Sequence, residues 1–499
     1  MATPTLTLVA ISDLHYIGRT RNPVQNARMR GELAKTLLRK VFLRLRHMGI
    51  KPDATIMLGD LVDNEDAPSA ENDLATIHAE LTHSAIPFLV CRGNHDVAST
   101  FDTLFHSQSG FHKIGDYGIL LFSDQYDHSH VCERTQADLE LPIRVAQENP
   151  GLPLIAIQHP PIYPAIQSHY PYRPKNVAKI IESYHKSGVL LSLSGHYHKG
   201  QKPRLNGDVL YHTVPALCEA PFSFSVIRMQ GTQVEIEEHV LELQLPNLID
   251  VHCHTENAYC ADDVETEQNI ALAKALGVTT LCITEHAFQL YFEKKYAMSF
   301  AWQNDPAAVQ KIWATPERYR MADYTAFAEK LRSPFVKIGL EVDLYDDGKL
   351  LLAPEDMEME WDILVGAIHC IHDYVHNTTT QKEAEKLFIR DVIALTSHPI
   401  KVLAHPFRFF KRHKLQLPTH LYGEVADILC DSGVALEINY HTHTPDPKFI
   451  EICAEKGVKC ALASDSHDLA EVGEFYPHMQ VLKQAGITPK MYPEALFSF

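Results

Sequence analysis

The chain has 499 residues, of which 45% are hydrophobic and 22% are charged, and its formal net charge is −18. This length exceeds what one hydrophobic core usually organises and suits two domains of roughly 200 to 250 residues each. The acidic balance argues against binding to long nucleic acids, because that binding depends on many Lys and Arg side chains that neutralise phosphates. A small phosphorylated partner, such as a nucleotide, fits this charge better.

The ten Cys residues are scattered without CxxC spacing and lie mostly in apolar runs, as reduced core thiols do. The first residues lack the basic region of a signal peptide and run directly into an expected strand. No apolar stretch approaches the roughly 20 residues that a membrane span needs. We therefore expect a cytoplasmic protein with no membrane partner.

In the first half, short apolar runs alternate with segments of helical periodicity. We expect strands at 6–12, 54–60, 86–94, 152–159 and 189–196, and helices at 30–48 and 74–82. Residues 209–245 read as successive strands without helices. The class is α/β, and residues 1–245 form the first predicted domain.

The second half, residues 246–499, repeats one pattern seven times. Each repeat is an apolar strand that ends in or near His, Glu or Asp, and the strands are LIDVHCH, TTLCITEH, FVKIGLEV, DILVGAIH, KVLAHP, VALEIN and KCALASDSH. Polar residues at the carboxyl ends of parallel strands meet at one mouth of a barrel, so we predict a distorted (β/α)7 barrel. The aromatic-rich residues 288–332 exceed a normal crossover, and we expect a helical subdomain with its own core there, in preference to a lid or substrate wall.

Metal-ligand residue types follow five expected strands of the first half. They form the motifs Asp13-Leu14-His15, Gly59-Asp60-Leu61-Val62-Asp63, Gly93-Asn94-His95-Asp96, His159 and Gly195-His196-Tyr197-His198. Residues at i and i+2 point to the same side while the chain is extended, so each such pair can serve one metal. Asp60 has two oxygens with which to bridge two cations, and His95 can stay unligated for proton transfer.

This ordered set resembles the calcineurin-like metallophosphoesterases over about residues 5–245, and most of all their cyclic-nucleotide phosphodiesterase branch. The resemblance implies an αββα sandwich with two divalent metals. It implies one metal on Asp13, His15 and His198, a second on Asn94, His159 and His196, Asp60 as the bridge, and His95 as the acid that protonates the leaving oxygen. Two such cations clamp phosphoryl oxygens and generate hydroxide at neutral pH. The mixed ligands favour Mn, Fe or Zn. We do not expect Asp63 to be a ligand: it is either a carboxylate at the start of a helix or a residue that orients a ligand.

A second set of ligand types follows the strands of the predicted barrel and resembles the PHP domain, named for polymerases and histidinol phosphatases, over about residues 247–499. The resemblance implies the ligands His252, His254, His286, Glu341, His369, His405, Asp465 and His467, with Glu341 as the bridge. Two or three divalent metals follow from it. Members with three metals often carry another His shortly after the HxH motif, where this chain has Glu256, Cys260 and Asp262, so the third site is open. Cys260 is either a zinc ligand or a buried thiol, and the thiol is favoured.

Phosphate also needs cationic partners, and a guanidinium offers two parallel hydrogen bonds to its oxygens. Arg408 is the candidate that we favour, whereas Arg412 fits a solvated basic loop equally well. His441 and His443 could contact substrate, although loop histidines at the surface are the simpler interpretation.

The leading hypothesis is a bifunctional phosphohydrolase, in which the N-terminal site opens a phosphodiester and the C-terminal site removes phosphate from the monoester. In one alternative the sites act independently and the PHP half trims nucleic-acid ends. In another, one half is a metal-stabilised scaffold without activity.

Overall fold

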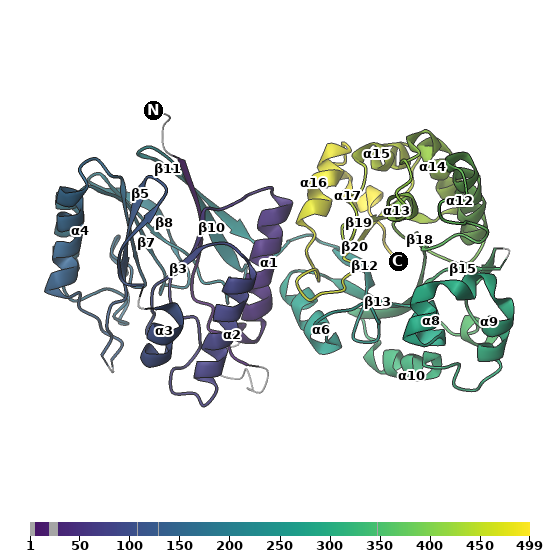
Figure 1. The fold of residues 1–499 in the computed structure, drawn as a ribbon, viewed down its shortest axis with the longest axis horizontal. Coiled ribbons are helices and arrows are strands. Elements are labelled where there is room, and N and C mark those ends of the chain that lie inside the picture. Colours follow the sequence, from purple (N-terminus) through teal and green to yellow (C-terminus); the bar gives the residue numbers. More distant parts are fainter. Residues whose placement is uncertain (1–4, 19–27, 107, 128, 347) are drawn as a thin grey trace. The chain divides into compact units, whose positions relative to one another are not determined.

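The computed structural model describes residues 5–18, 28–106, 108–127, 129–346 and 348–499. The chain divides into two compact units, Met1–Glu242 and Leu243–Phe499, and each is described by itself (Figure 1). Within the described ranges, the helices are too short or too polar for any of them to cross a bilayer.

The N-terminal unit contains two mixed sheets. The first sheet has the order β11-β10-β1-β2-β3, built from β1 (Thr5–Ile11), β2 (Ala54–Met57), β3 (Phe88–Val90), β10 (Ser223–Gln230) and β11 (Gln233–Val240). The second has the order β4-β5-β6-β7-β9-β8, built from β4 (Gly110–Ile114), β5 (Tyr117–Phe122), β6 (Leu154–Gln158), β7 (Val189–Ser194), β8 (Gln201–Asn206) and β9 (Val209–Thr213). In the first sheet β1, β2 and β3 run parallel, and β10 and β11 continue the sheet with antiparallel pairing. In the second sheet β5, β6, β7 and β9 run parallel, and the antiparallel strands β4 and β8 form the two edges.

The two sheets pack face to face around one apolar core. In β1 the alternate residues Leu6, Leu8 and Ala10 belong to it, as the period of two in a strand requires, together with residues of β2, β5, β6 and β7. A second core joins β5, β6 and β9 to α4 (Gln136–Glu148) and α5 (Val177–Ser187). On the first sheet's side lie α1 (Ala34–His47), α2 (Ala70–His83) and α3 (Ala98–Phe105) (Figure 1). The predicted αββα sandwich is confirmed.

The C-terminal unit is built on a parallel sheet with the order β12-β13-β14-β17-β18-β19-β20. Its strands are β12 (Ile249–Cys253), β13 (Thr280–His286), β14 (Val336–Val342), β17 (Ile363–Gly366), β18 (Val402–Leu403), β19 (Ala435–Asn439) and β20 (Cys460–Ala463). A parallel bridge between Cys253 and Ser466 brings the two edges together. The interior is packed with small and branched side chains such as Val251, Val365 and Ala461. This is the predicted (β/α)7 barrel, nearly closed.

Helices surround the barrel strands (Figure 1). They are α6 (Thr266–Ala275), α7 (Ala287–Tyr291), α8 (Lys294–Ser299), α9 (Pro306–Trp313), α10 (Met321–Leu331), α11 (Pro354–Met357), α12 (Gln381–Thr396), α13 (Arg408–Arg412), α14 (Tyr422–Ser432), α15 (Pro447–Glu455), α16 (Tyr476–Gln484) and α17 (Tyr492–Ala495), and the hairpin β15 (Leu344–Tyr345) and β16 (Lys349–Leu350) follows β14. The long insertion between β13 and β14 is helical, and Tyr291, Trp302 and Tyr324 are buried in it. The hydroxyl of Tyr324 donates to the carbonyl of Gly339 in β14 at 3.0 Å, so the insertion packs against the barrel, and a separate core of its own stays a prediction.

Candidate metal centres

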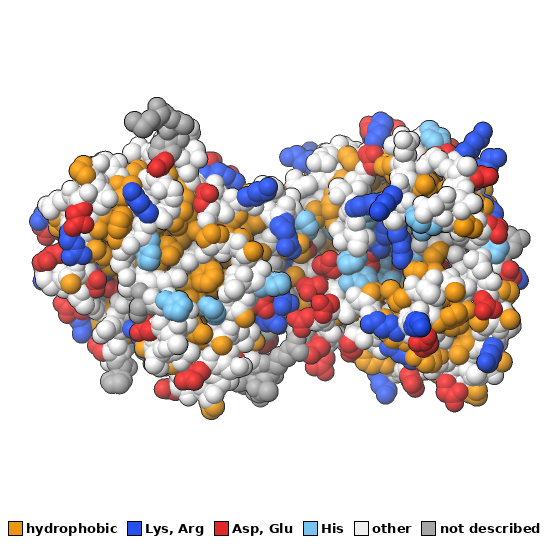
Figure 2. All heavy atoms as spheres, in the orientation of Figure 1, with side chains coloured by type: hydrophobic (Ala, Val, Ile, Leu, Met, Phe, Trp, Pro, Cys, Tyr) orange, Lys and Arg blue, Asp and Glu red, His pale blue; other side chains and the backbone are white. Residues whose placement is uncertain are grey.

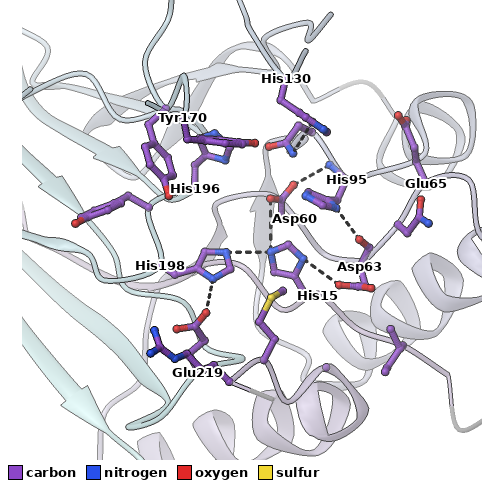
Figure 3. A pocket seen from close by; sticks show the side chains of 18 of the residues that line it. His15, Asp60, Asp63, Glu65, His95, His130, Tyr170, His196, His198 and Glu219 are labelled. Carbon is purple, nitrogen blue, oxygen red and sulfur yellow. Dashed lines mark hydrogen bonds and ion pairs between the residues drawn. The ribbon is translucent and has the colours of Figure 1, made fainter. Parts of the chain in front are cut away.

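The N-terminal candidate ligands lie just after the carboxyl ends of β1, β2, β3, β6 and β7. All of them except Asp13 and His159 line a pocket of about 940 Å³ (Figure 3). Asp13, His15, Asp60 and His196 have φ values of 53°, 45°, 50° and 66°, which is the left-handed region that such residues rarely adopt. Strain of this kind persists where the surroundings enforce it and is concentrated at functional sites. The Asp13–His15 pair therefore converges through bent backbone, whereas the sequence argument assumed an extended chain.

The first predicted ligand group, Asp13, His15 and His198, is assembled. The Nε2 atoms of His15 and His198 lie 3.1 Å apart, and they lie 3.9 and 3.6 Å from Oδ1 of Asp13. Nδ1 of His198 donates to Oε1 of Glu219 at 2.8 Å, which leaves Nε2 with a free lone pair. Burial lowers the pKa of His15 and thereby favours the neutral, metal-binding form.

In the second group, Nε2 of His159 lies 3.0 Å from Nδ1 of His196. Nδ1 of His159 donates to the carbonyl of Leu58 at 2.5 Å, so Nε2 again faces the cluster. Burial and the neighbouring His159 hold the pKa of His196 well below its usual value. The amide of Asn94 lies at the same pocket and lines it.

Asp60 lies between the two groups. Its Oδ2 is 3.2 Å from Nε2 of His159 and 3.7 Å from Nε2 of His15, and its Oδ1 accepts from the backbone N–H of His95 at 2.9 Å. Burial opposes its ionisation, but His159 and His95 hold the pKa of Asp60 well below the ordinary value. In return, Asp60 outweighs burial and raises the pKa of His159 to about 9. A carboxylate that attracts positive charge from both sides is suited to bridge two cations.

The donor set fits divalent metal ions. Oδ1 of Asp13, Oδ1 of Asn94 and Nε2 of His196 are buried polar atoms that have no hydrogen-bond partner. Buried polar atoms in proteins are nearly always satisfied, and ligation by a cation satisfies Asp13 and Asn94. The motif glycines allow the close approach: a Cβ at Gly93 would overlap the carboxylate of Asp60, and a Cβ at Gly59 would lie 2.6 Å from Nδ1 of His159.

His95 and Asp63 are adjacent at the rim of this cluster. Nδ1 of His95 donates to the backbone carbonyl of Asp63 at 2.6 Å, and Oδ1 of Asp63 lies 3.6 Å from Nδ1 of His15 (Figure 3). Asp63 precedes α2 by several residues, so of its two interpretations the orienting one fits the geometry. Asp96 was not assigned a role from the sequence; it accepts from the N–H groups of Leu61 and Gly93 at 2.7 and 2.8 Å and ties the two ligand loops together.

In the C-terminal unit, His252, His254 and Asp465 converge at one point. The Nε2 atoms of His252 and His254 are 3.1 Å apart. Oδ1 of Asp465 lies 3.1 Å from Nε2 of His254 and 3.6 Å from Nε2 of His252. Nδ1 of His252 donates to Oε1 of Glu437 at 2.7 Å. Asp465 and His405 have φ values of 46° and 28°, so strained ligand backbone recurs here.

Glu341 is fully buried and lies at the centre of this cluster. Its Oε1 is 3.0 Å from Nε2 of His405 and 3.5 Å from Nε2 of His369, and its Oε2 is 3.4 Å from Nε2 of His252. Burial opposes ionisation, yet the imidazoles, led by His286, hold the pKa of Glu341 well below its ordinary value. Oε2 has no hydrogen-bond partner although His286 is in contact with it, which again fits a shared cation.

A further triad, His254, His286 and His467, brings its ligand atoms within 4.8 Å of one another. Next to it, Sγ of Cys260 lies 3.4 Å from Nε2 of His286 and accepts from Gln289 at 3.2 Å. Burial raises the pKa of Cys260 to about 12, so the thiol form is favoured there. Cys260, one of the residues found where members with three metals often carry another His, therefore lies beside this triad.

Basic residues of α13 border the barrel mouth. A terminal nitrogen of Arg408 donates to Asp465 at 2.5 Å and to Asn439 at 3.2 Å, while its Nε is buried without a partner. Arg412 lies over the ring of Phe300 at 4.6 Å. Figure 2 shows Lys, Arg and His side chains gathered in the middle of the face that this unit presents.

His441 and His443 are half-buried. The ring of His441 stacks on His467 at 4.1 Å and its Nδ1 donates to Glu471 at 2.9 Å, and the ring of His443 lies 6.4 Å from His405. They are therefore part of the surroundings of the cluster, in contrast to the surface interpretation.

Sequence reasoning did not single out the carboxylates that hold the imidazoles. Glu219 holds His198, Glu437 holds His252, and Nδ1 of His369 donates to Asp343 at 2.9 Å. Only two of them carried a signal: Asp343 follows Glu341 at i+2, and Glu437 lies in an expected strand that ends at the mouth.

Fold and clusters together define a class: the chain is a metal-dependent phosphohydrolase, acting on phosphate esters. Residues 6–200 match the family described as calcineurin-like phosphoesterase, and residues 250–441 match the PHP domain. The chain therefore combines a calcineurin-like phosphoesterase domain with a PHP domain, and both belong to families that typically bind divalent metals.

Relatives match one half of the chain or less. A "Probable phosphatase" of Thermoanaerobacter pseudethanolicus is 26% identical over 250 residues, 48% of this chain and 87% of that protein. A "Probable cyclic nucleotide phosphodiesterase" of Rhodococcus erythropolis is 26% identical over 206 residues, which are 38% of this chain and 64% of that protein. A "Probable histidinol-phosphatase" of Deinococcus radiodurans is 24% identical over 252 residues, which are 46% of this chain and 90% of that protein. A dimetal phosphatase from Danio rerio is similar in structure with a TM-score of 0.39 and 14% identity, over 47% of this chain and 98% of that one.

Proposed function

We propose that the chain is a bifunctional phosphohydrolase, in which residues 1–245 cleave small, nucleotide-like phosphodiesters and residues 246–499 cleave phosphomonoesters. The observation that carries the proposal is that each unit assembles its own cluster of buried imidazoles around one central carboxylate, Asp60 or Glu341. Relatives named as a phosphodiesterase and as phosphatases fit this division of labour.

In the N-terminal unit, we assign one divalent ion to Asp13, His15 and His198, a second to Asn94, His159 and His196, and Asp60 to both. In the C-terminal unit, we assign two or three ions to His252, His254, His286, Glu341, His369, His405, Asp465 and His467. Mn, Fe or Zn suits these donors. Ions bound there would polarise the phosphoryl group and activate water for attack.

His95 is assigned the role of general acid in the diester reaction. Its Nδ1 proton is committed to the carbonyl of Asp63, so a second proton on Nε2 makes the ring an imidazolium that faces the pocket. Transfer of the Nε2 proton to the leaving ester oxygen yields an alcohol and leaves a neutral imidazole. Because Asp60 binds the backbone N–H of His95, the acid is positioned relative to the bridging carboxylate.

Arg408 is assigned to the phosphate of the monoester. Asp465 and Asn439 hold one end of the guanidinium, and the buried Nε is left to donate to a phosphate oxygen. A terminal phosphate carries more negative charge than a diester, and the basic residues of α13 surround this mouth. We also place the protein in the cytoplasm, because all ten cysteines are free thiols, as is usual in reducing compartments.

The test compares two single-site variants on two substrates, bis-p-nitrophenyl phosphate and p-nitrophenyl phosphate. His95→Ala should lose diester hydrolysis and retain monoester hydrolysis, and Asp465→Ala should do the reverse. If either variant retains both activities, the assignment of that site is wrong. Salt-sensitive binding of the protein to oligonucleotides would favour instead a C-terminal unit that acts on nucleic-acid ends.

A further inference from the structure

The loop between β6 and α5, residues 159–176, begins at the candidate ligand His159 and returns along the N-terminal pocket. Bonds to other segments anchor it, among them those from the N–H of Lys175 to the carbonyl of Cys132 at 2.9 Å and from Nδ2 of Asn176 to the carbonyl of Arg134 at 2.7 Å, and Arg173 donates to the carbonyl of Ile162 within the loop at 2.7 Å. A long loop without regular structure in a compact domain is commonly functional. This one brings aromatic rings to a pocket that is otherwise lined mainly by polar side chains.

Tyr170 and Tyr172 both line the pocket, and their ring centroids lie 5.5 and 5.3 Å from that of His196. Tyr172 is further held by Tyr197 at 5.1 Å. Tyr170 packs on Tyr172 at 4.7 Å and is nevertheless 37% exposed, so a good part of its ring is open. Figure 3 shows Tyr170 beside His196 at this wall. A large aromatic side chain that is anchored from behind and open in front is a contact surface for a ligand.

Tyr172 and His196 are tilted by 54° and 52° to Tyr170, whereas the ring of His130 lies nearly parallel to two of its neighbours. The ring of His130 is inclined by 29° to that of Tyr170, with centroids 6.2 Å apart, and by 15° to that of the proposed acid His95, with centroids 5.9 Å apart. Near-parallel rings along one wall favour a planar guest. A quaternary ammonium group would need rings that enclose it from several sides, whereas Tyr170 and Tyr172 pack against each other.

We propose that Tyr170 is a stacking platform for a nucleobase, so that the diester cleaved by the N-terminal unit is a nucleotide recognised through its base. The inference rests on the proposed diesterase function. It is consistent with the size of the pocket, because about 940 Å³ is far more than a phosphate group fills and is within the range of pockets for larger ligands. Stacking on an aromatic side chain tolerates any base, so adenine and thymine should both be accepted.

The test measures binding of AMP and of ribose 5-phosphate, which lacks only the base, to the Mn²⁺-loaded full chain by calorimetry. An Asp465→Asn background prevents hydrolysis at the C-terminal site. We expect AMP to bind roughly 10-fold or more tightly than ribose 5-phosphate, and Tyr170→Ala to bring this ratio close to one. Tyr170→Phe should keep the ratio, because the ring and not the hydroxyl carries the contact. Phe111→Ala removes an equally exposed ring outside the pocket and should change nothing.

Because partial unfolding weakens both ligands alike, the ratio separates stacking from a loss of structure. Equal binding of the two ligands in the parent protein, or an unchanged ratio in Tyr170→Ala, overturns the inference. So does a Tyr170→Ala variant that loses binding of glycerophosphocholine and not of AMP. A protein that stacks AMP on Tyr170 yet hydrolyses no diester refutes the proposed function and leaves the platform standing. A diesterase that binds AMP and ribose 5-phosphate equally refutes the platform and leaves the proposed function standing.

Discussion

Replacement of Asp60 by Asn should remove both divalent ions from the N-terminal unit and leave the C-terminal unit intact. The residue is 1% exposed, and its Oδ2 lies 3.2 Å from Nε2 of His159 and 3.7 Å from Nε2 of His15, so its charge acts directly on both ligand groups. The amide retains the shape and can still accept from the N–H of His95, which at present lies 2.9 Å from Oδ1. The change is therefore electrostatic and not steric.

The magnitude follows from Coulomb's law. A unit charge pair at about 4 Å and an effective dielectric constant of about 20 is worth about 4 kcal/mol, which corresponds to roughly a thousandfold in affinity. A divalent ion interacts more strongly than a unit charge, and the amide oxygen recovers part of the loss, so we take roughly a thousandfold as the expected effect for each ion.

The assay combines elemental analysis after gel filtration with both esterase activities. We expect Asp60→Asn to contain two ions fewer per chain than the parent protein, to lose diester hydrolysis and to keep monoester hydrolysis. Glu341→Gln is the matched control, because it makes the same change in the other cluster and should reverse the pattern. Full metal content and full diester activity in Asp60→Asn would refute the bridging role.

Two further predictions concern residues outside the proposed ligand sets. Glu437→Gln removes the charged acceptor from Nδ1 of His252, at 2.7 Å, so Mn²⁺ titration of monoesterase activity should show affinity about 10- to 100-fold weaker at unchanged diesterase activity. His212 is buried and neutral, and burial lowers its pKa to about 4. Its unfolded form binds the proton first, so His212 contributes stability above about pH 6.5 that is lost as the pH falls towards 4, by about 3 kcal/mol. Denaturant unfolding of His212→Gln should show a weaker decline over this pH range than that of the parent; an identical decline would contradict the reasoning.

Much of the fold could be read from the sequence because the buried strands carry near-continuous apolar runs. All seven barrel strands lie within their predicted segments. In the first half β1 (Thr5–Ile11) is displaced by one residue from the predicted 6–12, and the strands predicted at 54–60, 86–94, 152–159 and 189–196 are shorter than predicted. The buried strand β5 (Tyr117–Phe122) and its hairpin partner β4 were not predicted, although YGILLF is an apolar run. The edge strand β8 was missed for a different reason: its residues are largely exposed, so its pattern is not apolar.

The candidate ligands could be predicted because each lies at the end of an expected strand, and strand ends of a parallel sheet meet at one edge. The backbone that presents them could not. Asp13 and His15 lie in left-handed conformations, which no periodicity indicates, and the Asp63 carbonyl that holds His95 is a backbone group without a side-chain signal. Tyr170 lies in an irregular loop, where neither period of secondary structure applies.

In both units, hydrogen-bond acceptors outside the cluster orient histidine rings, which gives the two folds similar clusters. An imidazole can bind a metal through either ring nitrogen. When one nitrogen donates a hydrogen bond to an acceptor outside the cluster, the other nitrogen faces the cluster with a free lone pair. In each unit some histidines donate outward through Nδ1, such as His198 to Glu219 and His369 to Asp343, so that Nε2 faces the cluster, whereas His196 faces His159 through Nδ1. These acceptors come from other strands or turns, outside the motif that supplies the histidine. The ligand motifs thus predict which residues would bind a cation, whereas tertiary packing determines which ring nitrogen faces the cluster.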